Sequence, residues 1–133
     1  MIHIITDRQY ETHAIGAVIA RQGDVILEKA GEVTVGELLE ENEKNRVVLA
    51  HGEVTGHAHA FYYEEVTLPE PKKAVQLFSL PDQGPIARRL LRLAERCFLR
   101  HEEHETISLP KGDYFVKIQH EGDEINELRR VAD

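Results

Sequence analysis

The sequence contains a single cysteine, Cys97, among its 133 residues. One cysteine excludes an internal disulfide, and it also excludes a zinc site built mainly from thiolates. Disulfide-free chains are typical of reducing compartments, so we expect a cytoplasmic protein.

Long hydrophobic runs are missing as well. No stretch approaches the roughly 18 apolar residues that a membrane-spanning helix needs. The first residues, 1–7, lack the basic flank and the long apolar core of a signal peptide. We therefore expect no membrane segment.

Basic residues are outnumbered, with 16 Lys and Arg against 24 Asp and Glu and a formal net charge of −8. Nonspecific nucleic-acid binding depends on neutralising phosphates, so this charge argues against it. A local basic patch is still open at Lys72-Lys73 and along the arginines between residues 88 and 100. The sequence has no phosphate-binding loop, dinucleotide fingerprint or catalytic-triad signature, so it leaves the substrate open, whether small molecule or nucleic acid.

The sequence does contain many short alternating segments separated by turn residues. At this length the chain fits one domain, residues 1–133, that folds unaided. The pattern predicts a mainly β protein, a small antiparallel barrel or sandwich with one or two short helices. The expected strands lie at 2–5, 14–20, 25–29, 46–50, 57–66, 74–78, 106–109 and 113–120.

Three further segments carry helical patterns. Residues 33–44 are the clearest helix, because Thr34 and Glu37 form a capping-box pattern at its start. Residues 85–98 fit either an amphipathic helix or a strand. Residues 121–133 are highly charged and predict a short docked helix or a frayed tail.

Histidines gather in three places: three of them lie within residues 51–59, two within residues 101–104, and one is His120. On a strand, alternate side chains share a face, so His57 and His59 would present two imidazoles together. Imidazole with carboxylate suits Zn, Fe, Mn, Ni or Cu rather than Ca or Mg. We therefore hypothesise a divalent transition metal in a histidine-lined pocket, with Gly52 and Gly56 letting the backbone turn or approach closely.

The expected metal ligands are four histidines, with three weaker candidates beside them. In that order they are His57, His59, His104 and His120, then His101, His51 and Glu64. The expected catalytic side chains are His57, His59, His104 and Tyr63.

Part of this pattern resembles a known superfamily. Gly52, the run His57-Ala58-His59 and Glu64 resemble the first metal-binding motif of the cupins, and residues 110–112 resemble the Pro-x-Gly turn of their second motif. The resemblance implies a small antiparallel barrel in which histidines and a glutamate hold a divalent metal. It carries over His57 and His59 as ligands, and Glu64 as a further one.

Phe115 stands near the place where cupins have the histidine of their second motif. A third histidine ligand would therefore come from outside the family pattern, at His101, His104 or His120.

Two alternatives stay open. Imidazole titrates near neutral pH, so the clustered histidines with Tyr63 or Tyr114 could act as general acid and base in a metal-independent nuclease or phosphodiesterase that acts on RNA. Arginines between residues 88 and 100 would then contact phosphate. The other alternative is a non-catalytic binding or assembly module whose exposed strand edges pair into a homo-oligomer.

Overall fold

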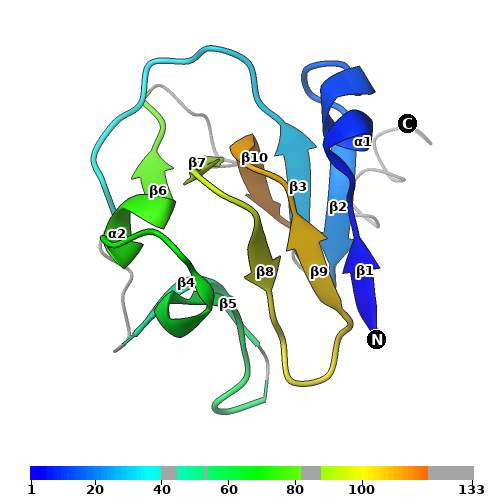
Figure 1. Cartoon of the computed structure of the whole chain (residues 1–133), viewed down its shortest axis with the longest axis vertical. Helices are drawn as coiled ribbons and strands as arrows, with labels where there is room; N and C mark the ends of the chain where they lie inside the picture. The colour runs from blue at the N-terminus through cyan, green and yellow to red at the C-terminus, as the bar shows by residue number, and fades with distance from the viewer. Residues whose placement is uncertain (40–44, 53, 82–87, 120–133) are drawn as a thin grey trace, which may run out of the picture.

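A computed structural model describes residues 1–39, 45–52, 54–81 and 88–119. Within these residues the protein is mainly β, as the alternating segments predict, with three sheets and short helices (Figure 1). The elements in chain order are β1 (Ile2–Ile4), α1 (Asp7–Thr12), β2 (Val18–Gln22), β3 (Val25–Lys29), β4 (Arg46–His51), β5 (Ala58–Tyr62), the 3-10 turn η1 (Tyr63–Glu65), α2 (Pro71–Ala74), β6 (Val75–Ser79), β7 (Arg89–Leu93), β8 (Cys97–Leu99), β9 (Thr106–Leu109) and β10 (Gly112–Ile118).

The largest sheet has five antiparallel strands in the order β2-β3-β10-β7-β6. Its first two strands form the hairpin that the sequence predicts. Gly23 makes the turn between them with a φ of 53°, a left-handed conformation that glycine adopts without a Cβ clash.

A three-stranded sheet, in the order β1-β9-β8, packs against the larger one (Figure 1). Leu99 and Leu109 from the small sheet share one buried cluster with Leu27 and Leu91 from the large sheet. The arrangement is therefore a sandwich, and the described strands do not close into a barrel. Strand β1 runs parallel to β9, which departs from the wholly antiparallel pattern expected from the sequence.

The third sheet is the hairpin of β4 and β5, and it joins the small sheet at one point. Ala60 in β5 and Arg100, just after β8, form an isolated antiparallel bridge. Both of its backbone hydrogen bonds are made, at 3.0 Å and 2.9 Å. This bridge sets the middle of β5 beside the end of β8.

The helix expected over residues 33–44 is wrong for its described part, residues 33–39, which contain no helix. The Gly36 N–H donates to the Ser79 carbonyl, and the Leu39 N–H donates to the Leu77 carbonyl. The segment thus satisfies its backbone groups along the edge of β6, which overrides the local capping pattern. Residues 40–44 lie outside the described residues.

For residues 85–98 the sequence fits either a helix or a strand. In the described part of this segment the structure has strands, β7 and β8. The sequence interpretation missed α1, where Thr6 and Gln9 form a capping box. The expected tail, 121–133, lies outside the described residues. No helix in the described part of the chain is long and apolar enough to cross a membrane.

Candidate functional site

The bridge between β5 and β8 brings two histidines together. In an antiparallel pair with Ala60 opposite Arg100, the neighbours His59 and His101 also lie opposite each other and on the same face. Their ring centroids are 4.3 Å apart. Two histidines 42 positions apart in the sequence are therefore in contact because of one backbone bridge.

The loop between β8 and β9 supplies a third ring. Residues 102–104 bend rather than extend, so His101 and His104 enter the same space, with centroids 4.6 Å apart. His104 also stacks on His59 at 5.9 Å. His57, just before β5, meets His101 edge-on at 5.7 Å. Four imidazoles thus converge.

These rings line a pocket of about 280 Å³. Asp24 and Glu103 add carboxylates to its wall, and no Lys or Arg is among its described lining residues. Glu102 is not among these lining residues, but the donor atoms of His57, His101 and Glu102 all lie within 4.8 Å of one another. The pocket therefore presents nitrogen and carboxylate donors without a competing cation.

His59 is the buried member, with 4% of its surface exposed. Its Nδ1 lies 2.8 Å from Oε1 of Gln22. Burial, and then the neighbouring His101 and His104, lower its pKa to about 4. His59 is therefore neutral at physiological pH, which is the form that binds metals.

The loop residues are held by backbone groups. The Glu102 carboxylate accepts the Ala58 N–H at 3.0 Å. Partial burial opposes ionisation, yet this hydrogen bond and the nearby histidines lower the pKa of Glu102. His101 Nδ1 accepts the Glu103 N–H at 3.0 Å, and burial followed by His104 lowers the pKa of His101.

Two glycines leave room for the rings. A Cβ on Gly23 would lie 2.8 Å from His104 Nε2 and 3.2 Å from His59 Cε1. A Cβ on Gly52 would lie 3.2 Å from His101 Nε2. The backbone of two separate turns therefore closes against the histidine cluster.

The structure brings together His57, His59 and His104, and it makes His101 the central ring rather than a weaker candidate. His51 is exposed at the end of β4 and does not line the pocket. Tyr63 begins η1, where the strand has ended, and packs against the main core. His120 lies outside the described residues.

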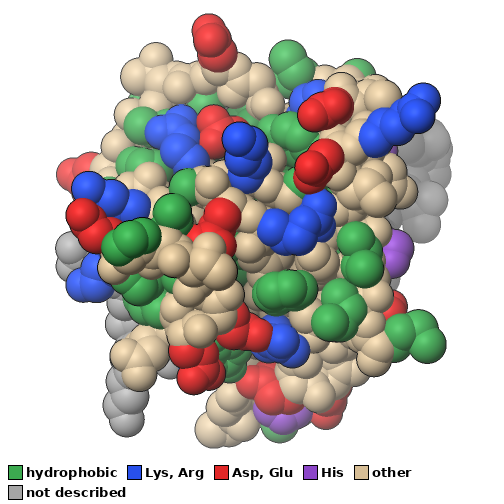
Figure 2. Space-filling view, in the orientation of Figure 1, with side chains coloured by type: hydrophobic (Ala, Val, Ile, Leu, Met, Phe, Trp, Pro, Cys, Tyr) green, Lys and Arg blue, Asp and Glu red, His purple; other side chains and the backbone are tan. Residues whose placement is uncertain are grey.

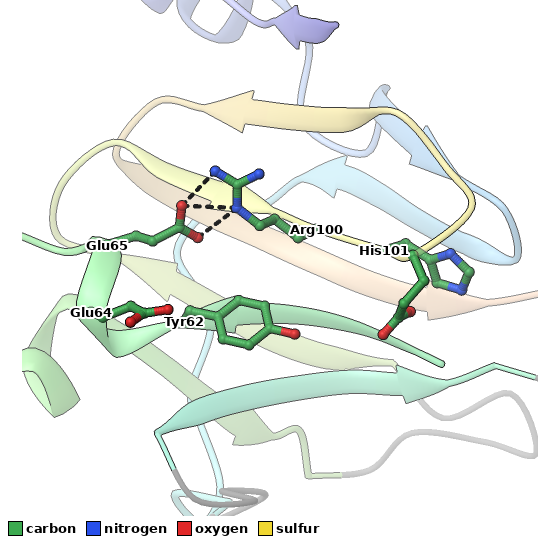
Figure 3. Close-up of a pocket in the computed structure, with 6 residues that line it drawn as sticks. Tyr62, Glu64, Glu65, Arg100 and His101 are labelled. Carbon is green, nitrogen blue, oxygen red and sulfur yellow. Dashed lines mark hydrogen bonds and ion pairs between the residues drawn. The ribbon is translucent and has the colours of Figure 1, made fainter. Parts of the chain in front are cut away.

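Glu64 does not join the histidine pocket either. It lines a second pocket of about 420 Å³, together with Tyr62, Glu65, Arg100, His101 and Glu102. Figure 3 shows Glu64 and Glu65 at one end of this pocket and His101 at the other. The glutamate beside the histidines is Glu102, whereas the cupin resemblance implies Glu64.

The arginines offered as phosphate contacts are engaged within the fold. Arg92 pairs with Asp113, Arg96 with Asp7, and Arg100 with Glu65. Arg88 lies 3.3 Å from Glu28, and Arg89 donates to the Leu49 carbonyl. On the face of the molecule that Figure 2 shows, basic and acidic side chains are interspersed rather than segregated by sign.

The model of one protein family, described as a domain of unknown function (DUF8820), matches residues 21–119, well over half of the chain. The chain belongs to this family. The DUF8820 match contains the whole histidine pocket, whose described lining runs from Gly23 to His104. Strand β1 and helix α1 precede it. No curated protein and no solved structure matches the chain.

Sequence reasoning missed two members of the site. Glu102 lies within His101-Glu102-Glu103-His104, a run that has histidines three apart and matches no standard zinc motif. Gln22 lies at the hairpin turn, where a polar residue is expected for the turn alone. Neither has a local signal that distinguishes it from a surface residue.

Proposed function

We propose that the histidine pocket binds a divalent transition metal ion, with His57, His101 and Glu102 as the first donors and His59 as a fourth. The observation that carries the proposal is the composition of the pocket wall. Four imidazoles converge there with carboxylates, and no Lys or Arg is among the described lining residues. Such a wall attracts a cation and repels a phosphate.

The ring spacing supports a shared ion. Two imidazoles on one tetrahedral metal, with nitrogens about 2 Å from it, have ring centres roughly 5 Å apart. The neighbouring pairs in the pocket are 4.3–5.9 Å apart. Rotation of side chains that already face one another can therefore complete the coordination.

Coordination of a metal ion requires a local movement of the donor side chains and the loss of one hydrogen bond. Donors around such an ion lie roughly 3–3.5 Å apart, whereas those of His57, His101 and Glu102 lie within 4.8 Å. His101 Nδ1 also accepts the Glu103 N–H, which places the ring proton of neutral His101 on Nε2. Binding therefore moves the His101 ring and replaces a hydrogen bond in an exposed loop, at a cost of about 1 kcal/mol.

The donor types narrow the metal but not the reaction. Imidazole with carboxylate favours Zn, Fe, Mn or Ni. A zinc ion held by three of these side chains would keep a fourth position for water or a substrate, as catalytic zinc sites do, whereas all four together would close a tetrahedral site. We expect the protein to be cytoplasmic, because its one cysteine is buried and forms no disulfide.

Calorimetric titration with Zn²⁺ tests the proposal, using tag-free protein stripped with a chelator. The wild type should bind one ion per chain, and His101→Ala should weaken binding at least tenfold, since it removes the central ring. His3→Ala is the matched control, because His3 is an exposed histidine of β1 outside the pocket. Equal binding by wild type and His101→Ala would contradict the proposal.

A further inference from the structure

Gln22 is a buried polar side chain in contact with the pocket. It is the last residue of β2, and only 3% of its surface is exposed. Its amide nitrogen donates to the carbonyls of Leu99 and Glu105, each at 2.9 Å. Its amide oxygen lies 2.8 Å from Nδ1 of His59. Both the nitrogen and the oxygen of this buried amide therefore have hydrogen-bond partners within the protein.

We infer that Gln22 is the positioning residue of the site: it fixes the tautomer of His59 so that Nε2 is the free nitrogen, and it clamps the loop that carries His101 and His104. The inference that Gln22 serves metal binding rests on the proposed metal site. The hydrogen bonds of Gln22 and the tautomer of His59 do not depend on a metal.

The tautomer follows from hydrogen-bond directions. Carbonyl oxygens only accept, so the Gln22 nitrogen has to face Leu99 and Glu105, and the Gln22 oxygen has to face His59. The amide oxygen of Gln22 can only accept a hydrogen bond, so neutral His59 must carry its proton on Nδ1. The lone pair that remains is on Nε2, the nitrogen available to an ion. A second-sphere amide that orients a ligating imidazole in this way raises metal affinity.

The clamp follows from where the two carbonyls lie. Leu99 ends β8 and Glu105 precedes β9, so one amide nitrogen ties both ends of the intervening loop. That loop carries His101, Glu102 and His104. Gln22 therefore sets the separation between His59 on one side and the loop donors on the other.

A purely structural role for Gln22 predicts something different. A buried amide can be retained only because its loss leaves three groups unsatisfied. In that case a variant that still folds would leave the His59 tautomer and the metal affinity unchanged. The tautomer is therefore the decisive readout.

Long-range ¹H–¹⁵N correlation spectra of ¹⁵N-histidine protein, metal-free at neutral pH, report which imidazole nitrogen is protonated. Wild-type His59 should show the Nδ1–H pattern. Gln22→Met removes the acceptor, so the Nδ1–H pattern should be lost and zinc affinity should fall about 10–100-fold. Gln22→Glu keeps an acceptor oxygen and should keep the Nδ1–H pattern.

Gln76→Met is the matched control, because it makes the same change in β6 at a residue that does not line the pocket. It should alter neither the tautomer nor the zinc affinity. A Gln22→Met protein that folds, keeps the Nδ1–H pattern and binds zinc as the wild type does would overturn the inference.

An Nε2–H pattern for His59 in the wild type would also overturn it, whether or not the Gln22→Met protein folds. Failure of the proposed function looks different. Wild-type protein that binds no zinc, with the tautomer changes still present, would remove the metal and leave the positioning role intact.

Discussion

The rings of His59 and His101 lie 4.3 Å apart across the bridge that joins β5 to β8. His59 lies in β5 and His101 lies in the loop after β8, and one backbone contact between Ala60 and Arg100 sets their register. A shift of that register by one residue would turn one ring to the opposite face. The site therefore depends on the fold as a whole rather than on a local motif.

The two glutamates of the β8–β9 loop should differ in their effect on metal binding. Glu102→Gln keeps an oxygen for the Ala58 N–H but removes a charged donor, so zinc affinity should fall at least about tenfold. Glu103→Gln should change it less than about fivefold, because Glu103 is 64% exposed and lies 3.8 Å from His57 Nδ1. Calorimetric titration of both variants measures this. Equal losses would show that charge alone matters.

The turn glycine of the first hairpin should affect both stability and the site. Gly23→Ala strains a residue with a φ of 53° and pushes a methyl group against His104 and His59. Gly16→Ala is the control, because Gly16 also has a positive φ, 87°, but a Cβ there would meet nothing within 4 Å. Each should lower the free energy of unfolding by about 1–2 kcal/mol in urea denaturation.

Only Gly23→Ala should also weaken zinc binding. If Gly16→Ala weakened zinc binding to the same extent, the loss would come from general destabilisation and the close approach of Gly23 would have no role.

Glu95 should make part of the stability depend on pH. Its carboxylate accepts hydrogen bonds from the Thr67 hydroxyl and from the N–H groups of Thr67 and Leu68. The Thr67 hydroxyl is the largest cause of a lowered pKa, and the backbone N–H groups add to it against a small effect of burial. A lowered pKa means that the stabilisation is present above the usual carboxyl range and is lost as the pH falls through the folded-state value.

Urea denaturation of wild type and Glu95→Gln should therefore differ by about 1 kcal/mol at pH 7. The difference should shrink as the pH falls below the ordinary carboxyl range, because the pKa of Glu95 is lowered in the folded state. A difference that grows on acidification would reverse the assigned sign.

RNA provides the test of the acid–base alternative. Because Arg92, Arg96 and Arg100 are paired with carboxylates and the histidine pocket carries acidic side chains, we expect weak RNA binding and no cleavage. Fluorescence anisotropy of a labelled RNA at low salt measures the binding, and gel analysis measures the cleavage. Cleavage that survives a chelator and fails in His57→Ala or His59→Ala would establish the nuclease interpretation instead.

The sequence predicted the parts of this molecule that depend on local pattern. Alternation located most strands, and the two histidines of His57-Ala58-His59 do line one pocket. The helix predicted over residues 33–39 does not form, although the sequence there has a capping-box pattern. Strand β6 has an open edge, and the backbone of residues 33–39 forms hydrogen bonds with it instead.

The rest of the site depends on contacts that no local pattern specifies. His101 becomes central only because Ala60 pairs with Arg100. The cupin resemblance implied Glu64, which follows the histidine pair in the chain, yet η1 ends the strand and carries Glu64 into another pocket. The role of Gln22 cannot be predicted from local sequence, because its partners, Leu99 and Glu105, are about 80 residues away.

X-ray absorption at the zinc edge reports directly which atoms hold a bound zinc ion. On wild-type protein loaded with one equivalent of Zn²⁺, we predict imidazole scattering from at least two histidines, at distances of about 2.0–2.1 Å, with a carboxylate oxygen in the same shell. His101→Ala should lose imidazole scattering, and His3→Ala should not. An oxygen-only shell, or no zinc retained at stoichiometric concentration, would contradict the account.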